Sequence, residues 1–277
     1  MQTSAPEPTA TIPASDVDFT LERDDVDCSS EELDGGGVEF TTAHFVVDGI
    51  LGAPCLGEQD QTVLDAWEAL AIIAPPLARA DLALFGGFVG GELADEVTLA
   101  FVNPVDDDGT VFQMSINLDS FDFDNDDSLL TVAHEFSHVF TLTPTQIDRT
   151  PEAEDSCQTF YNGEGCLQET SLLAQWIDEF WGEELLADFD PFEEPTVASG
   201  EPRCDLNPGF FGPYAASSPE EDFGESFSAF VFGLEVDHPL QEEKIDWMAS
   251  QPGLAEFRDR AVAADLTSLE NTFEECG

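Results

Sequence analysis

The feature that most constrains the fold of this chain is an apolar helix pattern that contains two histidines and a glutamate. Residues 131–140 read TVAHEFSHVF, which includes the pattern His-Glu-x-x-His. In a helix, His134 and His138 are one turn apart on the same face, so both imidazoles can bind one metal ion. Glu135 then lies beside that ion without being a ligand. Burying these groups unpaired is costly, which favours a metal site over a chance match on an exposed helix.

The residues around this motif indicate where the helix begins and ends. Asp126, Asp127 and Ser128 supply capping oxygens and negative charge suited to a helix N-terminus. Pro144 ends the helix. Apolar side chains surround the polar triplet at Leu129, Leu130, Val132, Ala133, Phe136, Val139 and Phe140. We therefore expect a buried helix at the floor of a cleft.

A catalytic zinc ion needs a third protein ligand and keeps its fourth position open for water. A third histidine six residues after the second is one common source, but that position holds proline here. The other common source is a glutamate from a later helix. Residues 218–233 fit such a helix, with Ser218 as its cap and Pro219 in its first turn. Glu221 and Glu225 share a face, so one can bind the metal while the other accepts a hydrogen bond from a ligating histidine. An exposed helix in a very acidic chain is the alternative.

Taken together, these motifs resemble the gluzincin metallopeptidases, in particular the branch that includes the anthrax lethal factor protease domain and related secreted bacterial zinc peptidases. In that branch a tyrosine lies seven residues before the ligand glutamate, which opens the pattern Glu-x-x-Ala/Gly-Glu-x-Phe. Tyr214, Glu221 and Glu225 match both spacings, and Gly224 stands where alanine is usual, a small-for-small change expected to matter little. The resemblance covers about residues 110–235.

The resemblance implies a zincin-like α+β fold, with a small mixed sheet and the metal helix in an upper half and a helical lower half. It implies Zn²⁺ held by His134, His138 and Glu221, with Glu220 as the alternative third ligand. Glu225 would orient a ligating histidine. The implied reaction is peptide-bond hydrolysis by a zinc-activated water, with Glu135 as general base and Tyr214 stabilising the oxyanion.

Two predicted strands precede the metal helix, at residues 96–104 and 110–121, and a turn joins them. In metallopeptidases of this type, an edge strand pairs with an extended peptide or protein substrate. The resemblance implies that residues 111–118 form this edge strand. Pairing through the backbone gives binding with little sequence preference.

We expect a tail at residues 1–27 and a catalytic domain at residues 28–277, divided into an upper half at 28–143 and a lower half at 144–277. The start of the tail lacks the apolar core of a signal peptide and is typical of a linker after a cleaved signal or a lipid-anchored cysteine. This composition favours a secreted protein or a cell-surface lipoprotein. The other expected elements are a strand at 38–51 with a structural His44, and helices at 62–73, 167–184, 240–250 and 254–270.

The charge is extreme, because 60 acidic residues face 7 basic ones and the net charge is −53. Such a chain is repelled by nucleic acid and by anionic membranes, and no apolar span of transmembrane length is present. The acidic residues are spread along the whole length, which favours a salt-adapted surface. We expect a monomer whose stability rises with salt.

The six cysteines contain no Cys-x-x-Cys pair, which argues against a cysteine-based zinc site. An even number favours three disulfides and an oxidising compartment. Cys157 and Cys166 flank a short loop and can close it, while the remaining pairings stay open.

The alternative function is a non-enzymatic acidic protein on a peptidase fold that binds calcium or surface partners. Residues 122–127 are rich in aspartate, but they lack the glycine and distant glutamate of a helix-loop-helix calcium site. Helix capping and solvation explain these acids better. Glu135 favours the enzyme, because a relic that binds no metal has no need of it.

Overall fold

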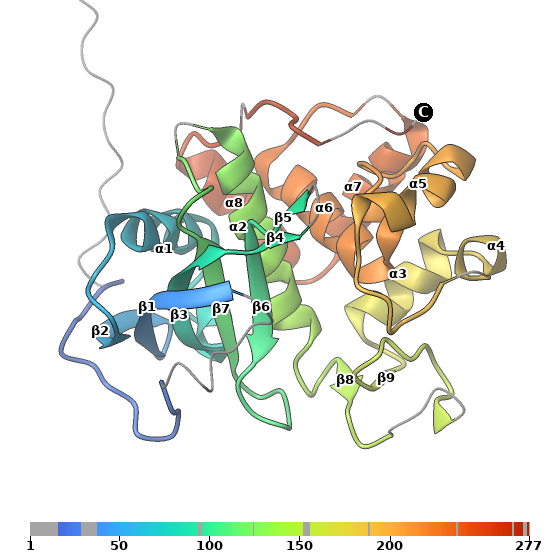
Figure 1. The fold of residues 1–277 in the computed structure, drawn as a ribbon. Helices are drawn as coiled ribbons and strands as arrows, with labels where there is room; N and C mark the ends of the chain where they lie inside the picture. Colours follow the sequence, from blue (N-terminus) through green and yellow to red (C-terminus); the bar gives the residue numbers. More distant parts are fainter. Residues whose placement is uncertain are drawn as a thin grey trace, which may run out of the picture.

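The computed structural model of the protein describes most of the chain. The ranges are residues 16–28, 38–93, 96–123, 125–151, 156–187, 189–236, 238–267, 269–273 and 276. The fold is α+β, as expected, with a five-stranded sheet and several helices (Figure 1).

The sheet has the strand order β2-β1-β3-β7-β6. Its strands are β1 (Val38–Val47), β2 (Ile50–Leu56), β3 (Leu82–Gly90), β6 (Ala100–Pro104) and β7 (Phe112–Asn117). The sheet is mixed, because β3 and β7 run parallel while the other neighbouring pairs are antiparallel. Alternate apolar residues of β7 enter a core shared with helices α1 (Gln61–Ile73) and α2 (Asp126–Thr141). In Figure 1, α2 lies near the centre of the molecule, with the sheet on one side and most of the helices that follow it in the chain on the other.

The first two strands form a hairpin where the sequence predicts a single strand at 38–51. The chain turns at Asp48 and Gly49, whose φ angles are 52° and 76°. Two consecutive positive φ angles are typical of the tight turn that joins antiparallel strands. The prediction of one continuous strand is therefore wrong, while the predicted helix at 62–73 is confirmed as α1.

The segment at residues 16–28 belongs to the folded domain, contrary to the expected tail at 1–27. Val17 forms a parallel bridge with Leu51 of β2. Asp16 accepts a hydrogen bond from the buried guanidinium of Arg79 at 2.6 Å, and the indole of Trp67 donates to the Asp16 carbonyl at 2.9 Å. This N-terminal segment covers the β2 edge of the sheet. The first fifteen residues of the expected tail lie outside the described residues.

The opposite edge of the sheet is β6, and this corrects a second expectation. Residues 111–118 were expected at the edge, but β7 lies between β3 and β6. The predicted strand at 96–104 is divided, because β5 (Glu96–Val97) pairs with β4 (Glu92–Leu93) instead of continuing into β6.

The second half of the chain is mainly helical. Its elements are β8 (Ile147–Asp148), β9 (Cys166–Leu167), α3 (Leu172–Phe180), α4 (Glu183–Leu186), α5 (Val197–Leu206), η3 (Ala215–Ser217), α6 (Pro219–Phe232), α7 (Pro239–Ser250) and α8 (Leu254–Ala263). The helix expected at 167–184 begins later, because Ser171 caps α3 and accepts a hydrogen bond from the backbone of Ala174. The last helix ends before residue 270, and α5 is not anticipated from the sequence.

All six cysteines are paired, as Cys28–Cys55, Cys157–Cys166 and Cys204–Cys276. Three disulfides and the local Cys157–Cys166 loop are thus confirmed, and they indicate an oxidising environment. Among the helices that the structure describes, none is long and apolar enough to cross a membrane.

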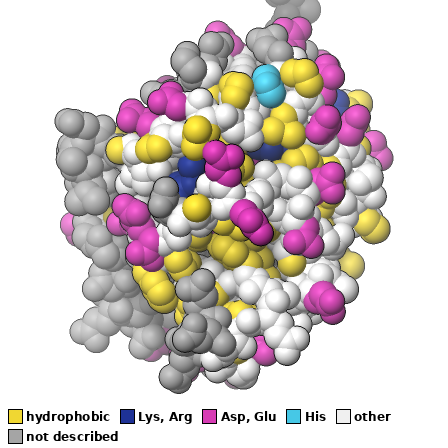
Figure 2. Space-filling model, turned by 90° about the vertical axis from the view of Figure 1, so that its right-hand side faces the viewer, with side chains coloured by type: hydrophobic (Ala, Val, Ile, Leu, Met, Phe, Trp, Pro, Cys, Tyr) yellow, Lys and Arg dark blue, Asp and Glu magenta, His cyan; other side chains and the backbone are white. Residues whose placement is uncertain are grey.

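Several arginines bind carbonyls at helix C-termini. Arg149 donates to Leu142 just after α2 at 2.7 Å, and Arg258 donates to Phe230 in the last turns of α6 at 2.8 Å. Arg260 donates to two carbonyls in the last turn of α1. Cations are favourable there because of the partial negative charge of the exposed carbonyls. Figure 2 shows acidic side chains dispersed over one face of the molecule, with few basic ones among them.

Candidate metal centre

Helix α2 carries the two motif histidines on the side that packs against α6. Its cap is Asn125, one residue before the capping residues expected from sequence. The side chain of Asn125 accepts a hydrogen bond from the backbone N–H of Asp127 at 3.1 Å. His134 is buried, with 5% exposure, and Glu135 is buried as well. His138, one turn further along, is partly exposed.

Helix α6 supplies the glutamate and has the expected boundaries. The hydroxyl of Ser218 accepts from the backbone N–H of Glu221 at 3.1 Å, and Gly233 ends the helix with a φ of 64°. Ser228 donates to the carbonyl of Leu130 on α2 at 2.8 Å, which ties the two helices together.

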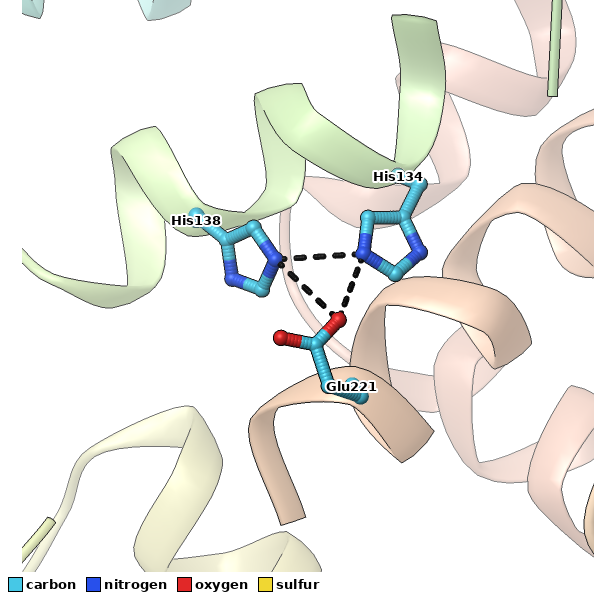
Figure 3. A group of neighbouring side chains, drawn as sticks. All are labelled: His134, His138 and Glu221. Carbon is cyan, nitrogen blue, oxygen red and sulfur yellow. Dashed lines mark hydrogen bonds and ion pairs between the residues drawn. The ribbon is translucent and has the colours of Figure 1, made fainter. Parts of the chain in front are cut away.

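Three donor atoms from these helices converge on one point (Figure 3). His134 Nε2 lies 2.8 Å from Glu221 Oε2 and 3.2 Å from His138 Nε2, and His138 Nε2 lies 3.8 Å from Glu221 Oε2. Zinc–ligand bonds of about 2.0–2.1 Å in a tetrahedron place ligand atoms about 3.3 Å apart. The three side chains therefore fit a zinc ion with a fourth position left open.

The charges of this group are strongly coupled in the metal-free protein. Burial alone lowers the pKa of His134, but the hydrogen bond and charge of Glu221, with the charges of Glu225 and Glu135, raise it to about 9. Burial would raise the pKa of Glu221, yet its contacts with the two histidines hold it well below its usual range. The ionised Glu221 therefore favours the protonated form of the His134 imidazole.

The two other catalytic candidates lie close to this group. Burial raises the pKa of Glu135, while both histidines oppose that rise. The ring of Tyr214 lies 6.0 Å from that of His134, centroid to centroid, and its hydroxyl donates to Glu221. Burial and nearby carboxylates raise the pKa of Tyr214 well above its ordinary value, so its hydroxyl remains a proton donor at neutral pH.

Glu225 and Glu220 occupy different positions from the three converging side chains. Glu225 Oε1 lies 3.6 Å from His134 Nδ1, which is within ion-pair range but too long for a hydrogen bond. Burial raises the pKa of Glu225 to about 8 and that of Glu220 to about 7. Glu220 does not join the converging group, so among the described residues Glu221 is the glutamate placed for ligation.

Gly224 has a larger role than the sequence suggests. A Cβ at this position would lie 2.8 Å from Cε1 and 2.9 Å from Nδ1 of His134. The absence of a side chain lets the imidazole rest against the backbone of α6. In this chain an alanine at position 224 would require the imidazole of His134 to shift.

The remaining histidines have structural roles. His44 is fully buried, as expected of a structural residue, and its Nδ1 lies 3.0 Å from the carbonyl of Gly52. His238 caps α7, with its Nδ1 accepting from the backbone of Leu240 at 3.2 Å.

In the aspartate-rich run, Asp126 accepts a hydrogen bond from the backbone of the C-terminal segment.

Sequence reasoning also missed a buried group next to the site, in which Asp222 contacts Trp176, Trp181 and Lys244. The available signal was that Lys244 is the chain's single lysine.

Comparison with known proteins adds little to this geometry. No protein family model matches the chain, and no curated protein matches it. One solved structure is similar, a candidate zinc-binding metallo-peptidase from Bacteroides caccae, with 14% identity and a TM-score of 0.32 over 73% of this chain. The chain spans 64% of that protein's length. At this level the similarity does not identify a family, so the site itself is the basis for assigning a function.

Proposed function

We propose that the protein is a zinc-dependent metalloendopeptidase of the gluzincin type, related to the lethal factor-like branch. The observation that supports it best is the convergence of His134 Nε2, His138 Nε2 and Glu221 Oε2 beside the buried Glu135. Two imidazoles and one carboxylate are a common ligand set of catalytic zinc. The open fourth position suits a water and a substrate carbonyl.

Bound zinc supplies Lewis-acid polarisation of the carbonyl and lowers the pKa of water. In the proposed reaction, Glu135 accepts the proton of the attacking water and returns it to the leaving amine. Burial raises the pKa of Glu135, which makes its carboxylate a stronger base for this step. Tyr214 donates a hydrogen bond to the oxyanion, which its raised pKa permits.

The substrate is proposed to bind as an extended peptide along β6. The N-terminal segment covers the β2 edge, whereas no described strand pairs with the outer side of β6. Strand β6 also packs against α2, which carries the motif histidines. An exposed strand edge binds a peptide through its backbone, and side-chain pockets then set preference. With three disulfides, we propose that the enzyme acts outside the cell, secreted or attached to the surface, as a monomer.

The test is cleavage of casein in molar sodium chloride with zinc, by wild type and by Glu135→Gln. The matched control is Glu179→Gln, the same change on the exposed face of α3. We expect Glu135→Gln to lose activity about 100-fold or more while still binding zinc, and Glu179→Gln to retain it. A chelator should abolish wild-type activity.

Equal activity of wild type and Glu135→Gln would overturn the mechanism. A wild type that binds zinc but leaves casein and other unfolded proteins intact would overturn the peptidase assignment in favour of a binding protein.

A further inference from the structure

The carboxylate next to Glu221 in sequence is fully buried and fully hydrogen-bonded. Asp222 Oδ2 accepts from the indole N–H of Trp176 and from that of Trp181, each at 2.9 Å. Asp222 Oδ1 accepts from Lys244 Nζ at 2.5 Å. We call Asp222 and these three donors the Asp222 network.

The donors come from three separate parts of the helical half. Trp176 lies in α3, Trp181 directly follows α3, and Lys244 lies in α7. Lys244 is the only lysine in a chain of net charge −53, and its side chain is only 1% exposed. A lysine in this position does not serve solubility. Burial lowers its pKa and raises that of Asp222, so each charge depends on the other and on the two indoles.

The network acts on the first turn of α6, where Glu221 lies. Consecutive residues of a helix point about 100° apart, so Glu221 faces α2 while Asp222 faces α3 and α7. The hydrogen bond from Ser228 to α2 lies about two turns further along. The Ser218 cap fixes the start of this turn, and Glu221 itself contacts His134. The Asp222 network adds hydrogen bonds that tie the same turn to α3 and α7.

We propose that Trp176, Trp181 and Lys244 act through Asp222 as positioning residues, which set the carboxylate of Glu221 at its distance from the two motif histidines. The proposal rests on the metal centre proposed above. A rotation of the first turn of α6 moves Glu221 relative to both histidines, and metal ligands tolerate little displacement. The network therefore contributes to metal affinity and coordination geometry as well as to stability.

The chain contains a matched control, the buried ion pair between Arg79 and Asp16, which joins the N-terminal segment to η1 (Ala78–Asp81). The test compares two double variants. One combines Asp222→Leu and Lys244→Met, and the other combines Asp16→Leu and Arg79→Met. Replacing both partners of a buried pair by apolar side chains avoids leaving a lone charge. The readouts are zinc affinity by competition with a chromogenic chelator, the visible spectrum of the Co²⁺-substituted protein, and the Tm of the metal-free protein.

We expect the Asp222/Lys244 double variant to bind zinc about tenfold more weakly or worse, with a changed Co²⁺ spectrum. The Asp16/Arg79 double variant should keep wild-type affinity and spectrum, whatever its Tm. A folded Asp222/Lys244 variant with wild-type affinity and spectrum would overturn the positioning role. Wild type that binds no zinc would instead overturn the metal centre, so the two failures are distinguishable.

If the Asp222/Lys244 variant does not fold, Trp181→Phe provides the test, because it keeps an aromatic ring and removes one N–H donor. The expected loss of zinc affinity is about threefold, as for one hydrogen bond. Unchanged affinity and an unchanged Co²⁺ spectrum in this variant would overturn the proposal.

Discussion

The two buried ion pairs of this protein differ in how completely their groups are satisfied. Asp222 receives three donors, and both its oxygens are hydrogen-bonded. Arg79 is fully buried, yet its Nε and Nη1 have no hydrogen-bond partner among the residues that the structure describes. Its Nη2 binds Asp16, and its guanidinium lies 5.1 Å from the ring of Trp67. The Asp222–Lys244 pair is enclosed by α3, α6 and α7, while the Asp16–Arg79 pair joins only the N-terminal segment to η1.

This difference matches what each region has to do. The N-terminal segment only has to cover a sheet edge, which tolerates small shifts in the position of its backbone. Helix α6 has to hold one carboxylate oxygen within about 0.5 Å of a required position for metal binding. A saturated hydrogen-bond network restricts orientation in a way that apolar packing does not. The comparison therefore predicts that the two pairs affect stability and metal binding differently.

The largest effect is expected for Lys244→Met, which leaves Asp222 buried without its cation. Breaking a buried pair by removing one partner costs about 3–5 kcal/mol of unfolding free energy. Arg79→Met should cost about half as much, because the side chain of Asp16 keeps 10% of its surface exposed whereas that of Asp222 keeps none. Urea unfolding of the metal-free variants measures both. A larger loss for Arg79→Met would reverse the comparison.

The next effect concerns the other side of α6, where Gly224 meets His134. Gly224→Ala should push the imidazole away and lower zinc affinity about tenfold. Gly182→Ala is the matched control, because a Cβ there meets no atom within 4 Å. Chelator competition on both variants is the measurement. Unchanged affinity in Gly224→Ala would show that His134 adjusts freely, and would leave Asp222 as the main restraint on the site.

The parts of the site that sequence predicted are those set by local spacing. His134 and His138 share a helix face because they are four residues apart, and Glu221 follows its cap, Ser218, by three. Helix caps and proline positions located α1 and α6 for the same reason.

The parts that sequence missed depend on contacts between distant residues. Gly224 matters because of an imidazole 90 positions earlier, and Asp222 is paired across a separation of 22 residues with Lys244 and 46 with Trp176. The edge position of β6 depends on strand order, which alternation of apolar residues does not determine. Sequence therefore predicted which side chains converge, but not what holds them in place.

A third prediction tests the charge state of the site. In the metal-free protein the pKa of His134 is raised to about 9, so the imidazole is protonated at neutral pH. Zinc binds only the deprotonated ring, and binding at pH 7.5 should release about one proton. Apparent affinity should then rise about tenfold per pH unit up to about pH 9. Calorimetry in buffers of different ionisation enthalpy measures the proton count.

The two regions should differ in proton release as well. The Asp16/Arg79 double variant should release the same number of protons as wild type, because that pair does not contact the site's carboxylates. In Gly224→Ala the displaced imidazole should lose part of its interaction with Glu221, which lowers the pKa of His134 and the number of protons released. Equal proton release in wild type and Gly224→Ala would show that the contact between His134 and Glu221 does not depend on this glycine.

The smallest expected effect is the salt dependence of what each buried ion pair contributes to the free energy of unfolding. With a net charge of −53, the whole protein should become more stable as sodium chloride screens repulsion between surface carboxylates. Buried pairs are screened much less, so the loss caused by Lys244→Met or Arg79→Met should vary by less than about 0.5 kcal/mol between 0.1 and 3 M salt. Urea unfolding at several salt concentrations checks both statements. The loss of stability caused by Arg79→Met could shrink with salt while the loss caused by Lys244→Met stays constant. That result would mean that solvent ions reach Arg79, and that only the Asp222 network is closed to them.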